Sequence, residues 1–571
     1  MALMTGDQLL ARSLKKCGAE VIFYLLGGPC LELVGECEKE GIKCIDTRDE
    51  RGASLMAQAY SRVTGKAGIC ITAAGPGTTN AVTGVSNAFI DSTPVIAIGG
   101  STALLTHEVG VFQEIDLLSI MKPITKRAWQ IGRTERIPAY VGMAFRHALS
   151  YKPGPVYLDC PADVLKGKVR ESQVLDSEEE IDPEGINRAH PAGDPEAVRK
   201  AVQLLWEAKR PLIIAGSGAL WSGAEASFKD FVEAAGIPFY TTPLARGLLP
   251  EDHPLCLTAA RNMAWREADV VLAIGTRANF IVQHFLPPRF SRRVKLIVVN
   301  IDAAEIGHNK RAQVGIVGDA GAVLRQLTAE VGDMFRSRKE LPWVKRLRAE
   351  DAQKRAEVEP LLNSDQVPIH PLRLCKEVRD FLPRESILVV DGNETLSFAR
   401  QTVPTYHSRH RLNSGVFGCI GIGVPFGIGA KVAKPDKSVL VLTGDGSFGY
   451  GAIEMDTAAR HKLPIVVVVS NNGGWVAKDD LFPLNRDLGF TSYEKLVEAL
   501  GGYGERVEQP QDIRPALERA FESGKPALVN VITDSTIAAI TQDFGAGAEG
   551  RKAALNSLAF AQQRAKEWVK A

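Results

Sequence analysis

The sequence lacks the features that mark disulfide-rich, membrane-spanning and nucleic-acid-binding proteins. Its nine cysteines are odd in number and no two are spaced C-x-x-C, so a disulfide framework is not indicated. Its apolar runs are far shorter than the ~18 residues that a membrane-spanning helix needs. Lys+Arg and Asp+Glu number 68 and 67, which leaves a formal net charge of +1 and no basic field for nucleic acid or membrane surfaces. We therefore predict no nucleic-acid and no membrane partner.

The two ends carry no recognised address. The start, from Met1 to Asp7, lacks the basic and apolar regions of a signal peptide, and the last three residues, Val-Lys-Ala, are not a peroxisomal signal. Several cysteines lie inside apolar runs, such as Cys70 within 68–71. This usage is typical of small buried hydrophobic residues in a reducing compartment, and it predicts a cytoplasmic protein.

What the chain does have is a regular alternation of apolar runs and helical stretches. Its 571 residues are 45% hydrophobic and 24% charged, which indicates a globular protein of three or four domains. The runs are rich in Val and Ile and apolar on both faces, as is typical of parallel strands covered by helices on both sides. The clearest of them are 67–72, 94–99, 211–216, 270–275, 295–301, 386–391, 438–443 and 464–470.

Two polar segments, 166–198 and 336–371, divide these runs into three sets. The predicted fold class is therefore α/β, with three doubly wound parallel-sheet domains followed by a C-terminal tail. The glycine-rich stretch in that tail, 543–550, is either a surface linker or the hinge of an active-site lid. The predicted domains are 1–165, 195–335 and 370–535, and the tail is 536–571.

The strongest chemical signal is a pair of motifs in the third domain. Strand 438–443 runs into Gly444-Asp445-Gly446-Ser447, a helical stretch follows at 452–461, and strand 464–470 runs into Asn471-Asn472-Gly473-Gly474. Parallel neighbours would bring Asp445 and Asn472 to one edge of the sheet. Their oxygens suit Mg²⁺, and the glycines let backbone N–H groups approach a diphosphate. Gly-Asp-Gly alone is equally typical of a turn, but the second motif makes the pattern specific.

The first domain adds a carboxylate and a glycine-rich loop. Glu50 follows strand 43–47, and the loop 74–80, which includes Gly75 and Asn80, follows strand 67–72 and opens a helix. Both features therefore lie at the carboxyl edge of a sheet. Considered singly, Glu50 could be a helix-start carboxylate favoured by the helix dipole, and the loop could cap any helix.

Together these motifs resemble the thiamine diphosphate enzymes of the acetolactate synthase, benzaldehyde lyase and oxalyl-CoA decarboxylase group, over nearly the whole chain. The resemblance implies that Asp445, Asn472 and the Gly474 carbonyl hold Mg²⁺ on the diphosphate. It also implies that Glu50 of a neighbouring subunit bonds the aminopyrimidine ring, so a homo-oligomer is expected, a dimer or a dimer of dimers. The other expected cofactor-binding residues are Gly75, Asn80, Gly444, Gly446, Ser447 and Ile420; Ile420 would wedge the cofactor into its bent form or be an ordinary core residue.

The middle domain indicates the branch of the group. Its segments 244–254, 275–280 and 286–290 resemble the 2-hydroxyacyl-CoA lyases and oxalyl-CoA decarboxylases. The resemblance implies that Arg277 contacts an adenine nucleotide, with ADP as a candidate ligand, and that Arg261 contacts the CoA moiety of an acyl-CoA substrate. Either arginine could instead be a solvated charge, and FAD-binding acetolactate synthases carry an arginine at the place of Arg277.

The first domain refines the choice through Phe112-Gln113, which is similar to the lyase pattern. The Gln113 amide can donate to and accept from a 2-hydroxyl group. Leu26 and Pro29 stand where benzaldehyde lyase has histidines. The resulting prediction is a thiamine diphosphate- and Mg²⁺-dependent 2-hydroxyacyl-CoA lyase that cleaves C1–C2 to formyl-CoA and an aldehyde or ketone, reversibly. The alternatives are a carboligase of the acetolactate synthase or benzaldehyde lyase type, an oxalyl-CoA decarboxylase, and a non-catalytic nucleotide-binding protein on this scaffold.

Overall fold

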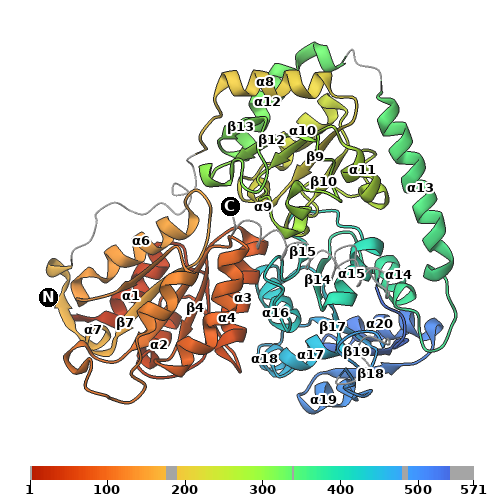
Figure 1. Ribbon diagram of the computed structural model, residues 1–571. Coiled ribbons are helices and arrows are strands. Elements are labelled where there is room, and N and C mark those ends of the chain that lie inside the picture. The colour runs from red at the N-terminus through yellow and green to blue at the C-terminus, as the bar shows by residue number, and fades with distance from the viewer. Residues whose placement is uncertain (1–2, 175–189, 337–339, 479–485, 540–571) are drawn as a thin grey trace, which may run out of the picture.

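The computed structural model describes residues 3–174, 190–336, 340–478 and 486–539 (Figure 1). Three α/β domains follow one another along the chain, each built on a parallel sheet. The predicted fold class is thereby confirmed. The tail predicted at 536–571 lies outside the described residues from 540 onward.

The N-terminal domain is a six-stranded parallel sheet with helices on both faces. Its strands are β2 (Val21–Tyr24), β3 (Lys43–Asp46), β4 (Gly68–Thr72), β5 (Val95–Ser101), β6 (Arg127–Gln130) and β7 (Val156–Pro161), in the order β3-β2-β4-β5-β7-β6. Its helices are α1 (Gly6–Lys16), α2 (Leu31–Lys39), α3 (Glu50–Thr64), α4 (Pro76–Ile90), α5 (Leu117–Met121), α6 (Ile137–Leu149) and α7 (Ala162–Lys166). A separate antiparallel pair joins β1 (Leu3–Thr5) to β8 (Lys168–Arg170).

The C-terminal domain repeats this topology. Its strands are β14 (Ile387–Asp391), β15 (Arg411–Leu412), β16 (Val439–Gly444), β17 (Val466–Asn471), β18 (Tyr503–Val507) and β19 (Ala527–Ile532), in the order β15-β14-β16-β17-β19-β18. Its helices are α14 (Pro371–Phe381), α15 (Asn393–Thr402), α16 (Gly423–Ala433), α17 (Asp445–Gly451), α18 (Glu454–Arg460), α19 (Tyr493–Ala499) and α20 (Ile513–Glu522). Successive connections leave β14 and β16 in opposite directions, so a crevice opens at the carboxyl ends of these two strands.

The middle domain is a five-stranded parallel sheet in the order β10-β9-β11-β12-β13. Its strands are β9 (Pro211–Ala215), β10 (Phe239–Thr241), β11 (Val270–Ile274), β12 (Lys295–Asn300) and β13 (Val314–Val317). Its helices are α8 (Pro195–Glu207), α9 (Ser217–Trp221), α10 (Glu225–Ala235), α11 (Arg261–Glu267) and α12 (Ala320–Arg336). The long helix α13 (Pro342–Leu362) then runs along the outside of the molecule to the C-terminal domain (Figure 1).

Helix α3 joins the N-terminal and C-terminal domains. It begins where the Asp49 side chain accepts the Arg51 N–H at 2.7 Å, and it ends at Gly65, whose φ of 79° closes the helix. It is buried almost all round because it packs against α16 of the C-terminal domain (Figure 1). Apolar residues of both domains therefore form one continuous core, whereas the middle sheet has two separate cores of its own, one on each face.

The cysteines are mostly buried, as the sequence analysis expects. All nine cysteines are free, and seven are buried: Cys17, Cys30, Cys37, Cys70, Cys160, Cys256 and Cys375. Across the described residues, no helix has the length and apolar character that crossing a membrane would require.

Candidate active site

A cavity of about 610 Å³ occupies the crevice at the carboxyl ends of β14, β16 and β17. Its walls come from the motifs that the sequence singles out, together with the start of α15 and Trp475. Seven predicted residues line it: Ile420, Gly444, Asp445, Gly446, Ser447, Asn472 and Gly474. The helical stretch predicted at 452–461 corresponds to α18, and a further short helix, α17, begins before it, at Asp445 itself.

Asp445 is a buried carboxylate with one oxygen that accepts no hydrogen bond from the described residues. Only 2% of the residue is exposed, and its Oδ2 atom has no hydrogen-bond partner among the described residues. Burial raises the pKa of Asp445 to about 6, although the backbone N–H groups of Gly446 and Gly474 favour the charged form. A buried carboxylate oxygen without a partner is costly unless something positive binds it, so this position fits a cation.

Asn472 and Gly474 form the other side of the candidate cation site. The Asn472 Oδ1 atom accepts the Gly474 N–H at 3.1 Å, which fixes the turn after β17. Arg486 lies behind this turn and donates to the Asn472 carbonyl at 3.2 Å and to the Val476 carbonyl at 2.7 Å. A Cβ atom at position 474 would lie 2.2 Å from Arg486 Nη2, so a larger residue here would displace the Arg486 guanidinium from this turn. The donor set of a carboxylate, an amide oxygen and a backbone carbonyl suits Mg²⁺.

Ile420 enters the cavity from a loop that Asp391 holds. The Asp391 carboxylate, at the end of β14, accepts the N–H groups of Gly392 at 2.7 Å and Gly423 at 2.9 Å. Burial raises the pKa of Asp391 to about 6 in spite of these donors. The loop before α16 is thus tied to the end of β14, and Ile420 projects from it into the cavity. Sequence reasoning missed Asp391, although Asp391-Gly392, like Asp445-Gly446, stands at the end of a strand.

A second group of predicted residues lies in the N-terminal domain. Glu50 is the first residue of α3 and is 6% exposed. Its Oε2 atom accepts the Asn80 Nδ2–H at 3.0 Å, and its Oε1 atom would lie 3.1 Å from a Cβ atom at Gly77. The structure therefore brings Glu50 to the glycine-rich start of α4, as the two strand-end motifs predict.

Gln113 closes on the same loop. Gly75, the N-cap of α4, has a φ of 56°, and a Cβ atom there would lie 2.7 Å from the Gln113 carbonyl oxygen. Gln113 itself has a φ of 64°, a conformation that non-glycine residues rarely adopt. The Glu114 carboxylate secures the loop by accepting the N–H groups of Gly110 at 2.7 Å and Val111 at 3.1 Å. The adjacent Phe112 is 87% exposed.

The comparisons with known proteins agree with this arrangement. Three family models match in chain order: the N-terminal TPP binding domain of thiamine pyrophosphate enzymes over residues 4–120, their central domain over 198–327 and their C-terminal TPP binding domain over 392–531. The chain belongs to the thiamine pyrophosphate enzyme family. It is a thiamine diphosphate-dependent enzyme of the carbon–carbon lyase type, which confirms the predicted family and coenzyme.

Several curated relatives resemble the chain over almost its full length. A 2-hydroxyacyl-CoA lyase of Oryza sativa subsp. japonica is 34% identical, covering 93% of this chain and 95% of its own. The acetolactate synthase large subunit IlvG of Mycobacterium tuberculosis is also 34% identical, covering 94% and 97%. The oxalyl-CoA decarboxylase of Escherichia coli (strain K12) is 32% identical, covering 94% and 96%. Similarity of this degree does not separate the three activities.

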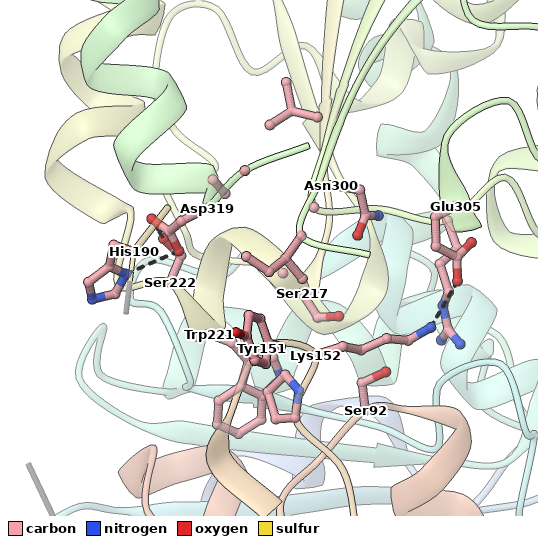
Figure 2. A pocket seen from close by; sticks show the side chains of 18 of the residues that line it. Ser92, Tyr151, Lys152, His190, Ser217, Trp221, Ser222, Asn300, Glu305 and Asp319 are labelled. Carbon is pink, nitrogen blue, oxygen red and sulfur yellow. Dashed lines mark hydrogen bonds and ion pairs between the residues drawn. The ribbon is translucent and has the colours of Figure 1, made fainter. Parts of the chain in front are cut away.

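A cavity of about 880 Å³ lies between the middle domain of this thiamine diphosphate enzyme and its N-terminal domain (Figure 2). Two ion pairs stand at its opposite ends: His190 with Asp319 at 3.2 Å, and Lys152 with Glu305 at 2.9 Å. The wall between them is aromatic, from Trp221 and Tyr151. Close packing of Gly218 against Gly275, whose φ is 57°, leaves the strand ends open to a ligand.

The two predicted nucleotide-binding arginines are placed differently. Arg277 lines this cavity, and its guanidinium donates to the Ile90 carbonyl at the end of α4. Arg261 begins α11 and lies over the Trp265 ring, 5.1 Å from its centroid. It lines neither the 880 Å³ cavity nor the 610 Å³ cavity. The structure therefore joins Arg277, but not Arg261, to a site that could hold a nucleotide.

Proposed function

We propose that the chain is a 2-hydroxyacyl-CoA lyase that cleaves the C1–C2 bond of a 2-hydroxyacyl-CoA to formyl-CoA and an aldehyde or ketone, and that runs in reverse as a carboligase. Relatives named 2-hydroxyacyl-CoA lyase from Arabidopsis thaliana and Homo sapiens, at 35% and 32% identity, support this choice. The observation that carries it is the close packing of the Gln113 backbone on Gly75, whose loop opens the helix that holds Asn80 against Glu50. This packing fixes Gln113 near Glu50, and its side-chain amide is a group that could orient a 2-hydroxyl.

The described residues fit the coenzyme. Asp445, Asn472 and the Gly474 carbonyl would hold Mg²⁺, while Gly444, Gly446 and Ser447 at the start of α17 would receive the diphosphate. Ile420 would support the bent form of the coenzyme. When bound, thiamine diphosphate supplies a carbon nucleophile and accepts the electron pair of the broken C–C bond. Glu50 would bond the aminopyrimidine ring, with Gly75 and Asn80 forming the edge around it.

The substrate side of the site falls to the loop before α5. Gln113 orients the 2-hydroxyl group and accepts its hydrogen bond as the carbonyl product forms, while Phe112 offers an apolar wall to the acyl substituent. The described residues that line the 610 Å³ cavity include no histidine, so water or the coenzyme's amine would be left to take up the proton of the hydroxyl.

The site is completed by a second copy of the chain. None of the described residues that line the 610 Å³ cavity belongs to the N-terminal domain, where Glu50 and Gln113 lie. Large apolar side chains are exposed close to the cavity and on the adjoining helices: Phe417, Tyr450, Ile453 and Trp475. A partner's N-terminal domain would cover them and deliver its Glu50, which makes the proposed state a dimer or a dimer of dimers.

The 880 Å³ cavity is the proposed site of an adenine nucleotide, with Arg277 as a contact. ADP is the preferred ligand, and FAD is the alternative if the chain proves to be an acetolactate synthase. Arg261 remains a proposed contact for the CoA moiety through a surface outside both cavities. We propose a cytoplasmic location for the protein.

The deciding experiment supplies the purified protein with thiamine diphosphate, Mg²⁺ and a series of 2-hydroxyacyl-CoA esters, and measures formyl-CoA by mass spectrometry. Formyl-CoA formation that the Glu50→Gln variant largely loses supports the proposal. A yellow protein that converts pyruvate to acetolactate, or one that releases CO₂ from oxalyl-CoA without cleaving any 2-hydroxyacyl-CoA, overturns it in favour of the corresponding alternative. Loading with ADP and with FAD, followed by thermal denaturation, shows which nucleotide the 880 Å³ cavity binds.

A further inference from the structure

A buried carboxylate of the C-terminal domain, Glu454 in α18, lies against the loop that carries Glu50 in the same chain. Only 2% of Glu454 is exposed. Its two oxygens accept the backbone N–H of Arg48 at 3.2 and 3.3 Å, and Oε2 also accepts the Thr457 hydroxyl at 2.6 Å. The Glu454 side chain of the C-terminal domain thus binds the backbone of the N-terminal domain two residues before Glu50.

Glu454 also contacts the first turn of α3. A Cβ atom at Gly52 would lie 2.3 Å from Glu454 Oε1, so the lack of a side chain at position 52 is what lets the carboxylate reach the start of the helix. Hydrogen-bond acceptors beside the first turn of a helix are favoured because its N–H groups have no partners within the helix. Glu454 therefore contacts the chain on both sides of Glu50, at Arg48 and at Gly52.

Neighbouring contacts from the same two short helices reinforce this placement. The Arg51 guanidinium donates to the Tyr450 carbonyl at 2.6 Å and lies over the Tyr450 ring, 4.7 Å from its centroid. His461 contacts the Asp46 carboxylate at 2.6 Å, and Arg460 contacts the same carboxylate. These three contacts lie at the periphery and are partly exposed, whereas Glu454 is the buried contact at the centre.

We propose that Glu454 is a positioning residue for Glu50: its carboxylate acts as a hydrogen-bond acceptor that fixes the start of α3, and so sets the place of the carboxylate that one subunit presents to the coenzyme of its partner. The inference rests on the role proposed for Glu50. It adds a link within one subunit, because α17 begins at the metal-binding Asp445 and leads directly into α18. The domain that holds one coenzyme thereby also positions the glutamate that serves the other.

An acceptor role and a charge role predict different results for two substitutions. Glu454→Gln keeps a carbonyl oxygen that can accept the Arg48 N–H and the Thr457 hydroxyl, so it should retain most of the wild-type turnover. Glu454→Ala removes both acceptors and leaves a cavity beside Gly52. It should lower kcat by about 10- to 100-fold with a much smaller change in KM, because a small displacement of a reacting group costs rate rather than binding.

Hydrogen exchange provides a measurement that needs neither coenzyme nor turnover. In the coenzyme-free protein, Glu454→Ala should accelerate amide exchange in residues 48–53 about tenfold, as expected for the loss of one backbone hydrogen bond, and Glu454→Gln should not. Glu494→Ala is the matched control, since Glu494 is a similarly buried carboxylate of the C-terminal domain that accepts Asn530 Nδ2–H at 2.8 Å and touches no part of 46–53. The control should lower the melting temperature to a similar degree and leave exchange at 48–53 unchanged.

The coenzyme gives the second readout. With thiamine diphosphate and Mg²⁺ bound, the ultraviolet circular-dichroism band of the imino tautomer should weaken in Glu454→Ala and persist in Glu454→Gln and Glu494→Ala. The inference is wrong if Glu454→Gln loses as much turnover as Glu454→Ala, or if Glu454→Ala leaves both exchange at 48–53 and the tautomer band unchanged. Failure of the role proposed for Glu50 is recognised separately, because the Glu50→Gln variant would then keep the wild-type band and turnover.

Discussion

Asp445 combines burial with an oxygen atom that no described group satisfies, and this combination makes its substitution informative. Replacing it by Asn keeps the shape but removes the charge that a cation would need. We expect Asp445→Asn to weaken thiamine diphosphate binding in the presence of Mg²⁺ by at least ~100-fold, the ~3 kcal/mol scale of a buried charged contact. Isothermal titration calorimetry of the coenzyme measures the change.

The stability of the same variant provides the control. Because burial raises the pKa of Asp445, the charged form is disfavoured in the coenzyme-free protein. Asp445→Asn without coenzyme should therefore unfold at the wild-type temperature or above it. Unchanged coenzyme affinity, or a variant that loses affinity only because it no longer folds, would contradict the role given to Asp445.

Asp7 allows a test of buried charge far from the candidate site. Burial, with Glu32 and Glu36 nearby, raises the pKa of Asp7 from 3.8 to about 7. The folded state then binds more protons than the unfolded state between these values, so this group lowers the free energy of unfolding as pH rises from about 4 to about 7 and adds no further change above that. In Asp7→Asn, urea denaturation should show a loss of stability between pH 5 and pH 8 that is smaller by roughly 1–3 kcal/mol.

Sequence analysis could predict those site residues whose neighbours along the chain form a recognisable local pattern. Asp445 and Asn472 follow apolar strands and are flanked by glycines, so parallel pairing alone brings them together. Glu454 and Arg486 act through contacts with Gly52 and Gly474, at separations along the chain that no local pattern encodes. Arg261 shows the opposite: the sequence indicated a binding residue, but the Arg261 side chain lies over the Trp265 ring and lines neither cavity.

Among the helices, α3 and α16 show what close packing between domains demands. A Cβ atom at Gly429 in α16 would lie 2.4 Å from the Met56 carbonyl oxygen and 2.8 Å from Ala59 Cβ. Gly429→Ala should therefore separate the two helices and lower the free energy of unfolding by about 1–3 kcal/mol, measured by chemical denaturation. The matched control is Gly35→Ala, in the middle of α2, where an added Cβ meets nothing within 4 Å and should stabilise by about 0.5–1 kcal/mol.

Sequence patterns predict the strands of this fold better than its helices. Strands of the three sheets are predictable because short runs of Val, Ile and Leu that end at a glycine are typical of buried parallel strands, and β11 and β16 follow this rule. Helix α17 was not predicted, because its seven residues, Asp-Gly-Ser-Phe-Gly-Tyr-Gly, include three glycines, which disfavour a helix. Nor does the sequence of α3 reveal that the helix is buried all round, because its burial comes from a domain almost 400 residues further along the chain.

For the assembled molecule, the separation of Glu50 from the 610 Å³ cavity leads to a complementation test. Subunits carrying Glu50→Gln and subunits carrying Asp445→Ala should each form inactive homodimers. Mixed dimers contain one site with both native residues, so random mixing in equal amounts should restore about a quarter of the wild-type activity. Activity is measured after joint refolding or co-expression. No recovery in mixtures shown by mass spectrometry to contain hybrids would place both residues of each site on one chain.

The apolar cores of the middle sheet include residues of helix α13 but none of the two outer sheets, while the two outer sheets share one core between them. Changes to the strand ends of the middle sheet can therefore alter which ligand fits there and leave the packing of the outer pair intact. Proteins descended from one ancestral gene could in this way bind different ligands in the middle domain while the candidate active site stays unchanged. A protein engineer could use the same boundary and exchange the central domain between relatives to change the ligand that it binds.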